Sequence, residues 1–169
     1  MSDAVQEHKA AAIVSLNVSI LTVSDTRILE TDTSGALIEG MVRVAGHAVL
    51  DRRIVRDEPD LIDATLREWL AVPDLHAILL TGGTGLSARD QTFETVNSMF
   101  TKPIPGYGEL FRMLSYHQIG PAAMLSRATG GLIDRVAVFT MPGSRAAVTL
   151  AMTDIILPEL PHVVREARK

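Results

Sequence analysis

The sequence predicts an α/β fold in which a mostly parallel sheet is covered by helices on both faces. Short runs rich in Val, Ile and Leu, typical of buried strands, alternate with longer segments of helical periodicity. The chain of 169 residues suits one domain and can bury roughly two thirds of its unfolded surface. No internal repeat, low-complexity tract or long linker interrupts the alternation.

The first half of the chain is predicted as strand, helix, strand, helix and strand. In the first helix, helical spacing brings Leu37, Met41 and Val44 together. The second helix carries Pro59 in its first turn, where proline is well tolerated. Its predicted core face is Leu61, Thr65, Leu66, Trp69 and Leu70. The five elements are expected at residues 15–24, 33–46, 47–56, 58–71 and 76–81.

The second half begins with a helix expected near residues 91–100. A Pro/Gly break, "KPIPGYG", then precedes the helical stretch "ELFRMLSYHQI". A short segment, "PAAMLSRATGGLI", leads to the strand "RVAVFTMP" and the helix "RAAVTLAMTDII". We expect a single domain over residues 1–169, with its core at about 15–158 and a flexible N-terminus at 1–12.

Composition excludes several classes of protein. The formal net charge of -4, with basic residues scattered along the chain, does not suggest binding to nucleic acid or to an anionic membrane. Without cysteine there is no disulfide, thiolate nucleophile or thiolate metal site. The N-terminal stretch has charged residues where a signal peptide needs an apolar run, and we find no stretch near the ~20 apolar residues of a membrane span. We therefore expect a cytoplasmic protein.

Polar residues gather in the loops that follow the predicted parallel strands. Because such loops emerge at one edge of a sheet and ligands bind there, their side chains are expected to meet. Hydroxyls, glycines, acids and arginines make a mixture that a buried core does not need. The loops are residues 24–27, 56–58, 81–90 and 141–145.

The loop Thr81-Gly82-Gly83-Thr84-Gly85 follows an apolar strand and exposes backbone with little side-chain cover. Its N–H groups can converge on a phosphate, although a tight turn between strand and helix explains the glycines equally well. Gly83-x-Gly85-x-x-Ala88 matches the dinucleotide fingerprint, but the motif follows the third strand, so we reject that interpretation. A Walker A loop is also missing.

Two acids adjoin predicted helix starts. Asp57 and Asp90 each suit an N-cap, and each also suits a site where Mg²⁺ lies between a carboxylate and phosphate. These residues alone leave both interpretations open. The five histidines lack zinc-site spacing, and no serine lies in G-x-S-x-G.

Residues 81–94, "TGGTGLSARDQTFE", resemble the TGGTG…RD.TPE signature of the MogA/MoaB family of molybdenum-cofactor proteins, which is related to the gephyrin G domain. Further family segments are matched in order by "PGYGELFRM", "LSRATGG" and "MPGSRAAV". The residues of these segments are more similar to the MoaB branch than to MogA. The resemblance covers about residues 15–158. It implies a three-layer α/β/α fold and assembly as trimers or hexamers.

The resemblance also implies an activity, a molybdopterin adenylyltransferase (nucleotidyltransferase) in molybdenum-cofactor biosynthesis. Such enzymes use Mg²⁺ and ATP to transfer AMP to the terminal phosphate of molybdopterin, releasing pyrophosphate. A molybdenum-insertion protein is a potential downstream partner, whereas nucleic acid and membrane are not expected. Alternatives are a non-catalytic pterin-binding or assembly protein of the MoaB type, or a nucleotide pyrophosphatase related to competence-damage proteins.

By this resemblance, individual residues acquire expected roles. Asp57 and Asp90 match the two family acids, with catalytic and metal-binding roles near the ATP phosphates. The loop 81–85 would bind the pterin phosphate and the attached AMP. In the family's T-P-E, phenylalanine replaces proline at position 93, which affects loop rigidity more than chemistry. The remaining expected substrate-binding residues are Glu94, Ser126 and Arg127, then Pro142, Gly143 and Ser144 on the nucleotide side, and Ser24 and Asp25 as weaker nucleotide candidates.

Overall fold

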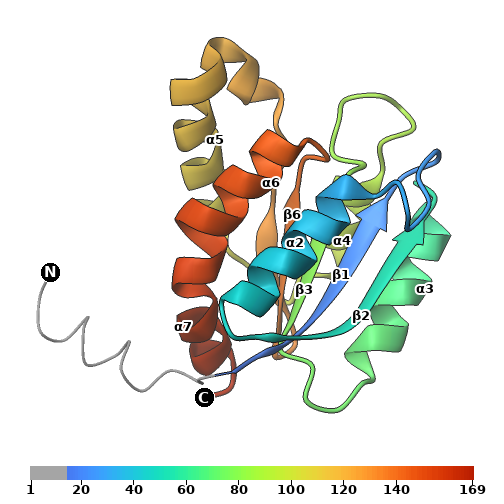
Figure 1. Cartoon of the computed structure of the whole chain (residues 1–169), viewed down its shortest axis with the longest axis vertical. Coiled ribbons are helices and arrows are strands. Elements are labelled where there is room, and N and C mark those ends of the chain that lie inside the picture. Colours follow the sequence, from blue (N-terminus) through green and yellow to red (C-terminus); the bar gives the residue numbers. More distant parts are fainter. Residues whose placement is uncertain (1–14) are drawn as a thin grey trace, which may run out of the picture.

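The computed structural model describes residues 15–169, so the segment predicted as a flexible N-terminus lies outside the described residues. Six strands form one sheet in the order β2-β1-β3-β6-β5-β4, with helices on both faces (Figure 1). The predicted α/β fold is confirmed. The strands are β1 (Asn17–Val23), β2 (Ala48–Val55), β3 (Ala77–Thr81), β4 (Lys102–Pro103), β5 (Gly130–Ile133) and β6 (Val136–Met141).

The helices divide into two layers. Helices α2, α5, α6 and α7 pack on one sheet face, where Ile20 and Leu79 belong to the core, and α3 and α4 pack on the other, with Leu21 and Leu80. Neighbouring residues of one strand thus serve opposite cores, as strand geometry requires. The helices are α2 (Thr33–Val44), α3 (Pro59–Leu70), α4 (Thr92–Met99), α5 (Pro105–Ile119), α6 (Arg145–Ala151) and α7 (Leu157–Ala167), with a 3₁₀ turn at Gly120–Leu125.

Strand directions are mixed at one end of the sheet. Strands β2, β1, β3 and β6 are parallel, whereas β5 runs antiparallel to β6 and β4 antiparallel to β5. The sequence did not indicate β5, because glycines have low strand propensity. A Cβ on Gly130 would lie 2.6 Å from the Phe139 ring, so the ring requires glycine at this position.

The buried faces of two helices differ in part from the apolar stripes found in the sequence. Leu37, Met41 and Val44 do lie together on α2 and line a surface cavity of about 480 Å³; Leu37 and Met41 are partly buried and pack against the core, whereas Val44 is 91% exposed. The core side of α2 is formed by Ile38 and Val42. Helical periodicity finds a stripe, but the direction in which the helix docks decides which stripe is buried.

Helix α3 shows the same kind of shift. Thr65, Leu66 and Trp69 are buried as predicted, whereas the predicted core residue Leu61 is exposed and its neighbour Ile62 is fully buried. Adjacent apolar residues differ by about 100° around a helix. The choice between them depends on the sheet that the helix meets.

The C-terminal helix is longer than predicted. A π-helical segment, Met152–Ile156, joins α6 to α7, which holds Pro158 in its first turn. Together Arg145–Ala167 are long and apolar enough to cross a membrane by length and composition, contrary to the expectation that the chain has no such stretch. Leu160 and Val164 of this helix are fully buried in the core cluster. Packing against the sheet therefore accounts for its apolar composition.

Two buried histidines hold the start of β1. His47 Nδ1 accepts a hydrogen bond from the Leu16 amide at 3.4 Å, and His76 Nδ1 accepts one from the Asn17 amide at 3.0 Å. Burial lowers the pKa of both imidazoles, which favours the neutral, accepting form. Their contribution to stability should be complete above the unfolded-state pKa of about 6.5 and be lost as pH falls through the lower folded-state pKa.

We therefore expect the free energy of unfolding to fall on acidification below about pH 6.5, measured by urea denaturation at a series of pH values. A double variant, His47→Gln with His76→Gln, removes both titrating groups but keeps an acceptor. Its pH dependence in this window should be flatter than that of the unaltered chain. An equal slope in both proteins would exclude the histidines as its cause.

Candidate functional site

Four parallel strands end at the same edge of the sheet and deliver their loops to one place. The loops contact one another through backbone and side chains. Thr81 Oγ1 donates to the Pro142 carbonyl at 3.2 Å, and the Gly82 amide donates to the Met141 carbonyl at 3.1 Å. The Asp57 amide donates to Asp25 Oδ1 at 3.2 Å. The loops after β1, β2, β3 and β6 therefore form one connected rim.

The glycine loop after β3 has a backbone that other residues cannot easily adopt. Gly82 and Gly83 have φ angles of +95° and +63°. No group within residues 15–169 accepts a hydrogen bond from the amides of Gly83, Thr84 or Gly85. Consecutive amides without partners are the donors that an anion requires. The geometry suits the predicted phosphate loop, although the Thr81 hydroxyl donates its hydrogen to the Pro142 carbonyl.

Asp57 is buried beside this loop, with 7% of its surface exposed. It is not a helix cap, because α3 has Glu58 at its N-cap position without a side-chain cap bond. Instead, Asp57 Oδ1 accepts a hydrogen bond from the Gln91 amide at 3.0 Å. Burial raises the pKa of Asp57, and the charges of Asp90 and Asp25 raise it further. A cation at this carboxylate would oppose that shift.

Asp90 also lacks the capping role. The N-cap of α4 is Gln91, which makes no side-chain cap bond. Asp90 Oδ2 accepts a hydrogen bond from the Ser87 amide at 3.1 Å, which closes the turn before the helix. A Cβ on Gly85 would lie 2.7 Å from the same oxygen, so the carboxylate lies directly against the glycine loop.

Asp25 is held in an ion pair. Arg89 contacts it in a bidentate manner, Nε to Oδ2 at 2.9 Å and Nη2 to Oδ1 at 2.8 Å. This contact lowers the pKa of Asp25 to about 2. The neighbouring Ser24 Oγ accepts hydrogen bonds from the Thr26 and Arg27 amides. Asp25 therefore joins the glycine-loop segment to the β1 loop. No local pattern in the sequence predicts this contact, although Arg89 lies in the motif TGGTGLSARDQTFE.

Arg127 lies just before β5, contacts the glycine loop, and is 20% exposed. It donates to the Thr84 carbonyl at 3.2 Å and the Asp90 carbonyl at 3.0 Å, and it pairs with Glu94. Its guanidinium lies 5.3 Å from the centre of the Phe93 ring. The aromatic residue that replaces the family's proline thus packs on the arginine that holds the loop.

Three further predicted residues share a small cavity. Ser126, Pro142 and Ser144 line a space of about 130 Å³. Ser144 also caps α6, because its Oγ accepts a hydrogen bond from the Ala147 amide at 3.2 Å. The other lining residues are Phe111, Ser115, Gln118, Ile119, Ala146, Ala147 and Leu150, most of them apolar.

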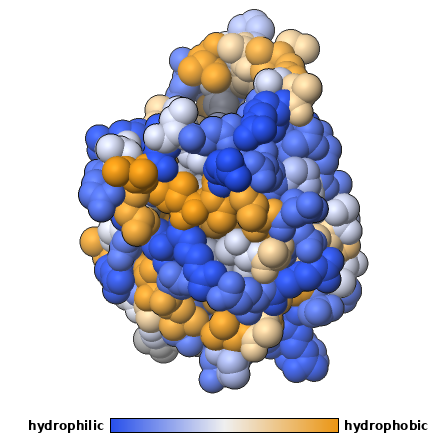
Figure 2. Space-filling model, turned by 90° about the vertical axis from the view of Figure 1, so that its right-hand side faces the viewer, coloured by the Kyte–Doolittle hydropathy of each residue, from blue (hydrophilic) through white to orange (hydrophobic). Residues whose placement is uncertain are grey.

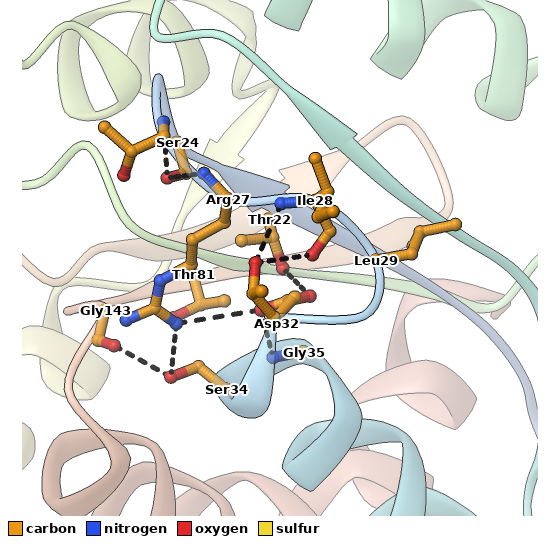
Figure 3. A network of polar contacts seen from close by, with 12 residues as sticks. Thr22, Ser24, Arg27, Ile28, Leu29, Asp32, Ser34, Gly35, Thr81 and Gly143 are labelled. Atoms are coloured by element: carbon orange, nitrogen blue, oxygen red, sulfur yellow. Dashed lines mark hydrogen bonds and ion pairs between the residues drawn. The ribbon is translucent and has the colours of Figure 1, made fainter.

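A buried network beneath the rim was not predicted (Figure 3). Asp32 caps α2 by accepting from the Gly35 amide at 2.9 Å, and its second oxygen accepts from Thr22 Oγ1 at 2.8 Å. Ser34 Oγ donates to the Gly143 carbonyl at 2.8 Å. An aspartate three residues before Gly35 is a cap signal, but its partner Thr22 lies on another element. This network ties the start of α2 to the loop after β6.

Metal-binding capacity at the rim is limited to few protein ligands. Within residues 15–169 no group of three or more His, Cys, Asp or Glu side chains is arranged to hold a metal ion. The Thr92 hydroxyl, fully buried, has no hydrogen-bond partner in the described part of the chain. A Cβ on Gly83 would lie 2.1 Å from this hydroxyl and 2.5 Å from Asp57 Oδ2, so the two oxygens are neighbours.

The fold and the site define an α/β protein with a rim of loops at the ends of its parallel strands. This rim combines backbone amides that have no partner with two carboxylates that do not cap a helix, an arrangement suited to phosphorylated ligands. The family model described as "Probable molybdopterin binding domain" matches residues 19–162. The chain belongs to the MoaB/MogA family of molybdenum cofactor biosynthesis proteins.

Individual relatives agree with this assignment. The molybdenum cofactor biosynthesis protein B of Bacillus subtilis (strain 168) is 49% identical over 166 residues, covering 98% of each chain. A crystal structure of a molybdenum cofactor biosynthesis protein B has 46% identity and a TM-score of 0.89, covering 91% of this chain and 96% of that one. The tungsten cofactor synthesizing protein MoaB from Pyrococcus furiosus has 33% identity and a TM-score of 0.85, covering 94% and 100%.

Proposed function

We propose that this protein transfers AMP from ATP to the terminal phosphate of molybdopterin in a Mg²⁺-dependent reaction. The observation that carries the proposal is the placement of Asp57 and Asp90 beside three amides without partners, with neither acid used as a helix cap. The names of the relatives, which concern molybdenum and tungsten cofactor synthesis, support a pterin substrate.

In the proposed reaction, an oxygen of the molybdopterin phosphate attacks the α-phosphorus of ATP. A new P–O bond forms, the bond between the α-phosphorus and the bridging oxygen breaks, and pyrophosphate leaves with the electron pair. Phosphate and triphosphate both carry negative charge, so the protein must hold two anions together. The amides of residues 83–85 would donate to the pterin phosphate, because they have no other acceptor.

Other residues would line the substrate site or hold its loops in place. Ser24 and the segment 142–144 would line the nucleotide side, and Ser126 the pterin side, next to the small cavity that it shares with Pro142. Because the Asp25 and Arg127 side chains are engaged within the protein, we assign them to holding the loops. Glu94 would serve the same purpose through its pair with Arg127.

Asp57 and Asp90 are the residues that would hold Mg²⁺. Magnesium usually binds one or two carboxylates and completes its shell with water and substrate phosphates, so the small number of protein ligands fits it. When bound, the ion would neutralise phosphate charge. The raised pKa of Asp57 and the orphan hydroxyl of Thr92 beside it also fit a cationic or hydrated ligand at this point.

The proposal is tested by mixing the protein with ATP, Mg²⁺ and molybdopterin and measuring pyrophosphate and adenylylated pterin. Both products should appear in equal amounts and require all three components. Tight pterin binding without ATP consumption at saturating substrates would contradict the transfer reaction and favour a non-catalytic pterin-binding or assembly role. Hydrolysis of a nucleotide without the pterin acceptor would point to a pyrophosphatase.

Replacing Thr92 with valine should separate activity from folding. The change removes a buried hydroxyl without a partner, so the free energy of unfolding should stay equal or rise by up to about 1 kcal/mol. If the hydroxyl serves the ligand beside Asp57, AMP transfer should fall about tenfold. Urea denaturation and pyrophosphate release on the same preparation measure both quantities. Unchanged turnover would make Thr92 a packing residue only.

We also propose a homo-oligomer, a trimer or a hexamer. Seen from the side of β2 and α3, apolar surface occurs in patches separated by hydrophilic side chains (Figure 2). Large exposed apolar residues are instead frequent on α5 and the following turn. These residues are Leu110, Met113, Tyr116, Ile119, Met124 and Leu125. Light scattering at micromolar concentration should give at least three times the monomer mass of 18.3 kDa, and a monomer would refute the proposal.

For location, we propose the cytoplasm, because the long apolar helix Arg145–Ala167 contributes to the protein core. We propose no nucleic-acid or membrane partner. A protein that inserts molybdenum downstream remains the proposed protein partner.

A further inference from the structure

Five arginines lie on the connected loops or contact them: Arg27, Arg56, Arg89, Arg127 and Arg145. Arg89 and Arg127 make several hydrogen bonds within the protein. Arg89 uses Nε and Nη2 on Asp25. Arg127 uses all three of its guanidinium nitrogens, on Glu94 and on two backbone carbonyls. Each of these guanidinium groups is therefore paired with a carboxylate of the protein, Arg89 with Asp25 and Arg127 with Glu94. Arg127 has no nitrogen left without an acceptor, whereas Arg89 keeps Nη1 but has its charge balanced by Asp25.

Arg27 differs from both. Its Nη1 donates to Ser34 Oγ at 3.3 Å and lies 3.8 Å from Asp32 Oδ1. Its Nε and Nη2 donate to no group of residues 15–169. Asp32 is fully buried, and its two oxygens already accept from the Thr22 hydroxyl and the Gly35 amide. Asp32 thus attracts Arg27 Nη1 from 3.8 Å and leaves Nε and Nη2 available as donors.

The position of Arg27 is set by the backbone and by the network around it. Its amide donates to Ser24 Oγ at 3.2 Å, which fixes the loop after β1. Ser34, which accepts from Arg27, donates onward to the Gly143 carbonyl. Figure 3 shows the guanidinium beside Ser34, whose hydroxyl meets the Gly143 carbonyl in the loop after β6. The side chain remains 37% exposed, so a ligand can reach it.

The negative charge of the rim acids means that a phosphorylated ligand needs a cation such as Arg27 nearby. Asp57 and Asp90 repel an incoming phosphate, and the amides of the glycine loop carry only partial charge. We propose that Arg27 binds a phosphoryl group of the substrates through Nε and Nη2, and that it selects phosphorylated ligands over uncharged ones. This inference rests on the proposed function, because it concerns the same site. The recognised group is a phosphoryl oxygen pair, supplied either by the nucleotide or by the pterin.

Arginine suits this task better than lysine. Its guanidinium is permanently charged, and two parallel N–H groups match two oxygens of one phosphoryl group. A lysine at this position would keep the charge but lose the fork. Arg27→Lys should therefore recover part of the phosphate affinity that a neutral side chain loses.

The experiment measures binding of inorganic pyrophosphate, ATP, adenosine and molybdopterin by calorimetry, with Mg²⁺ present. Arg27→Met should weaken pyrophosphate binding by roughly 10- to 100-fold, as expected for the loss of charge-assisted hydrogen bonds, and leave adenosine binding unchanged. Arg56→Met is the matched control. Arg56 also follows β2 at the rim, but it is 65% exposed and pairs with Glu58 at 3.3 Å. Its replacement should change pyrophosphate affinity less than threefold.

The binding measurements with ATP and with molybdopterin identify which substrate supplies the phosphoryl group. A parallel loss of ATP affinity assigns Arg27 to the nucleotide, and a selective loss of molybdopterin affinity assigns it to the pterin. The inference is overturned if the unaltered protein does not bind pyrophosphate, or if Arg27→Met binds it normally. Arg27-dependent pyrophosphate binding in a protein that transfers no AMP would instead sink the proposed function and leave this inference standing.

Discussion

Asp90→Asn should slow AMP transfer by about two orders of magnitude while leaving the fold intact. The loss corresponds to ~3 kcal/mol, a typical cost of removing one preorganised electrostatic contact from a transition state. Stability should change by less than about 1 kcal/mol, because asparagine retains an oxygen that can accept from the Ser87 amide. Molybdopterin binding should be largely spared, since the glycine loop supplies its own donors.

The measurements are melting temperature, pterin affinity and initial rate of pyrophosphate release on one preparation. Asp60→Asn is a suitable control, because Asp60 is an exposed acid in the first turn of α3, outside the glycine loop. It should show nearly normal turnover. The structure already excludes helix capping as the main role of Asp90. Nearly normal turnover in Asp90→Asn would therefore remove the chief reason for regarding the chain as an adenylyltransferase.

Gly82→Ala should be the most disruptive single substitution in the rim. Gly82 has a φ of +95°, and an added Cβ would lie 2.2 Å from the carbonyl oxygen of Val23. This oxygen belongs to the buried strand β1 and cannot move aside as a flexible side chain would. Backbone strain and overlap together should cost about 2 to 4 kcal/mol of unfolding free energy. Turnover should also be lost, because the displaced loop carries the amides that face the ligand.

Gly40→Ala is the matched control for this change. Gly40 lies within α2, and a Cβ there meets nothing within 4 Å. Since alanine favours a helix more than glycine, the variant should be equally stable or up to about 1 kcal/mol more stable. Urea denaturation of both variants gives the comparison. A Gly82→Ala protein as stable as the Gly40→Ala protein would show that the loop backbone adjusts freely.

Sequence patterns predicted much of the fold because these parts depend on local periodicity. Apolar runs located β1, β2, β3 and β6, and helical spacing with Pro59 located α3. The rule that parallel strands end at one edge then placed the loops after them together. The glycine loop and both acids were located by their positions after strands and before helices, which required no knowledge of long-range contacts. The family resemblance then gave the two acids their expected roles.

Other features were decided by tertiary structure. Which apolar stripe of α2 is buried, and that Gly130 belongs to a strand, depend on the sheet and on the Phe139 ring. The roles of Asp57 and Asp90 as caps or ligands could not be separated in the sequence, because both need a carboxylate before a helix. Their hydrogen bonds to Gln91 and Ser87 separate these roles in the structure.

The difference between Arg27, Arg89 and Arg127 is also a tertiary property. Arg89 meets Asp25 across 64 positions in the sequence, and Arg127 meets Glu94 across 33. Pairings at such distances carry no local pattern. Arg27 lies 3.8 Å from a fully buried Asp32 whose two oxygens each accept a closer hydrogen bond, from Thr22 and Gly35. The sequence by itself determined that acids, glycines and arginines would gather at one edge; folding decided which charges cancel and which remain for a ligand, because charges cancel through distances that only the packed chain sets.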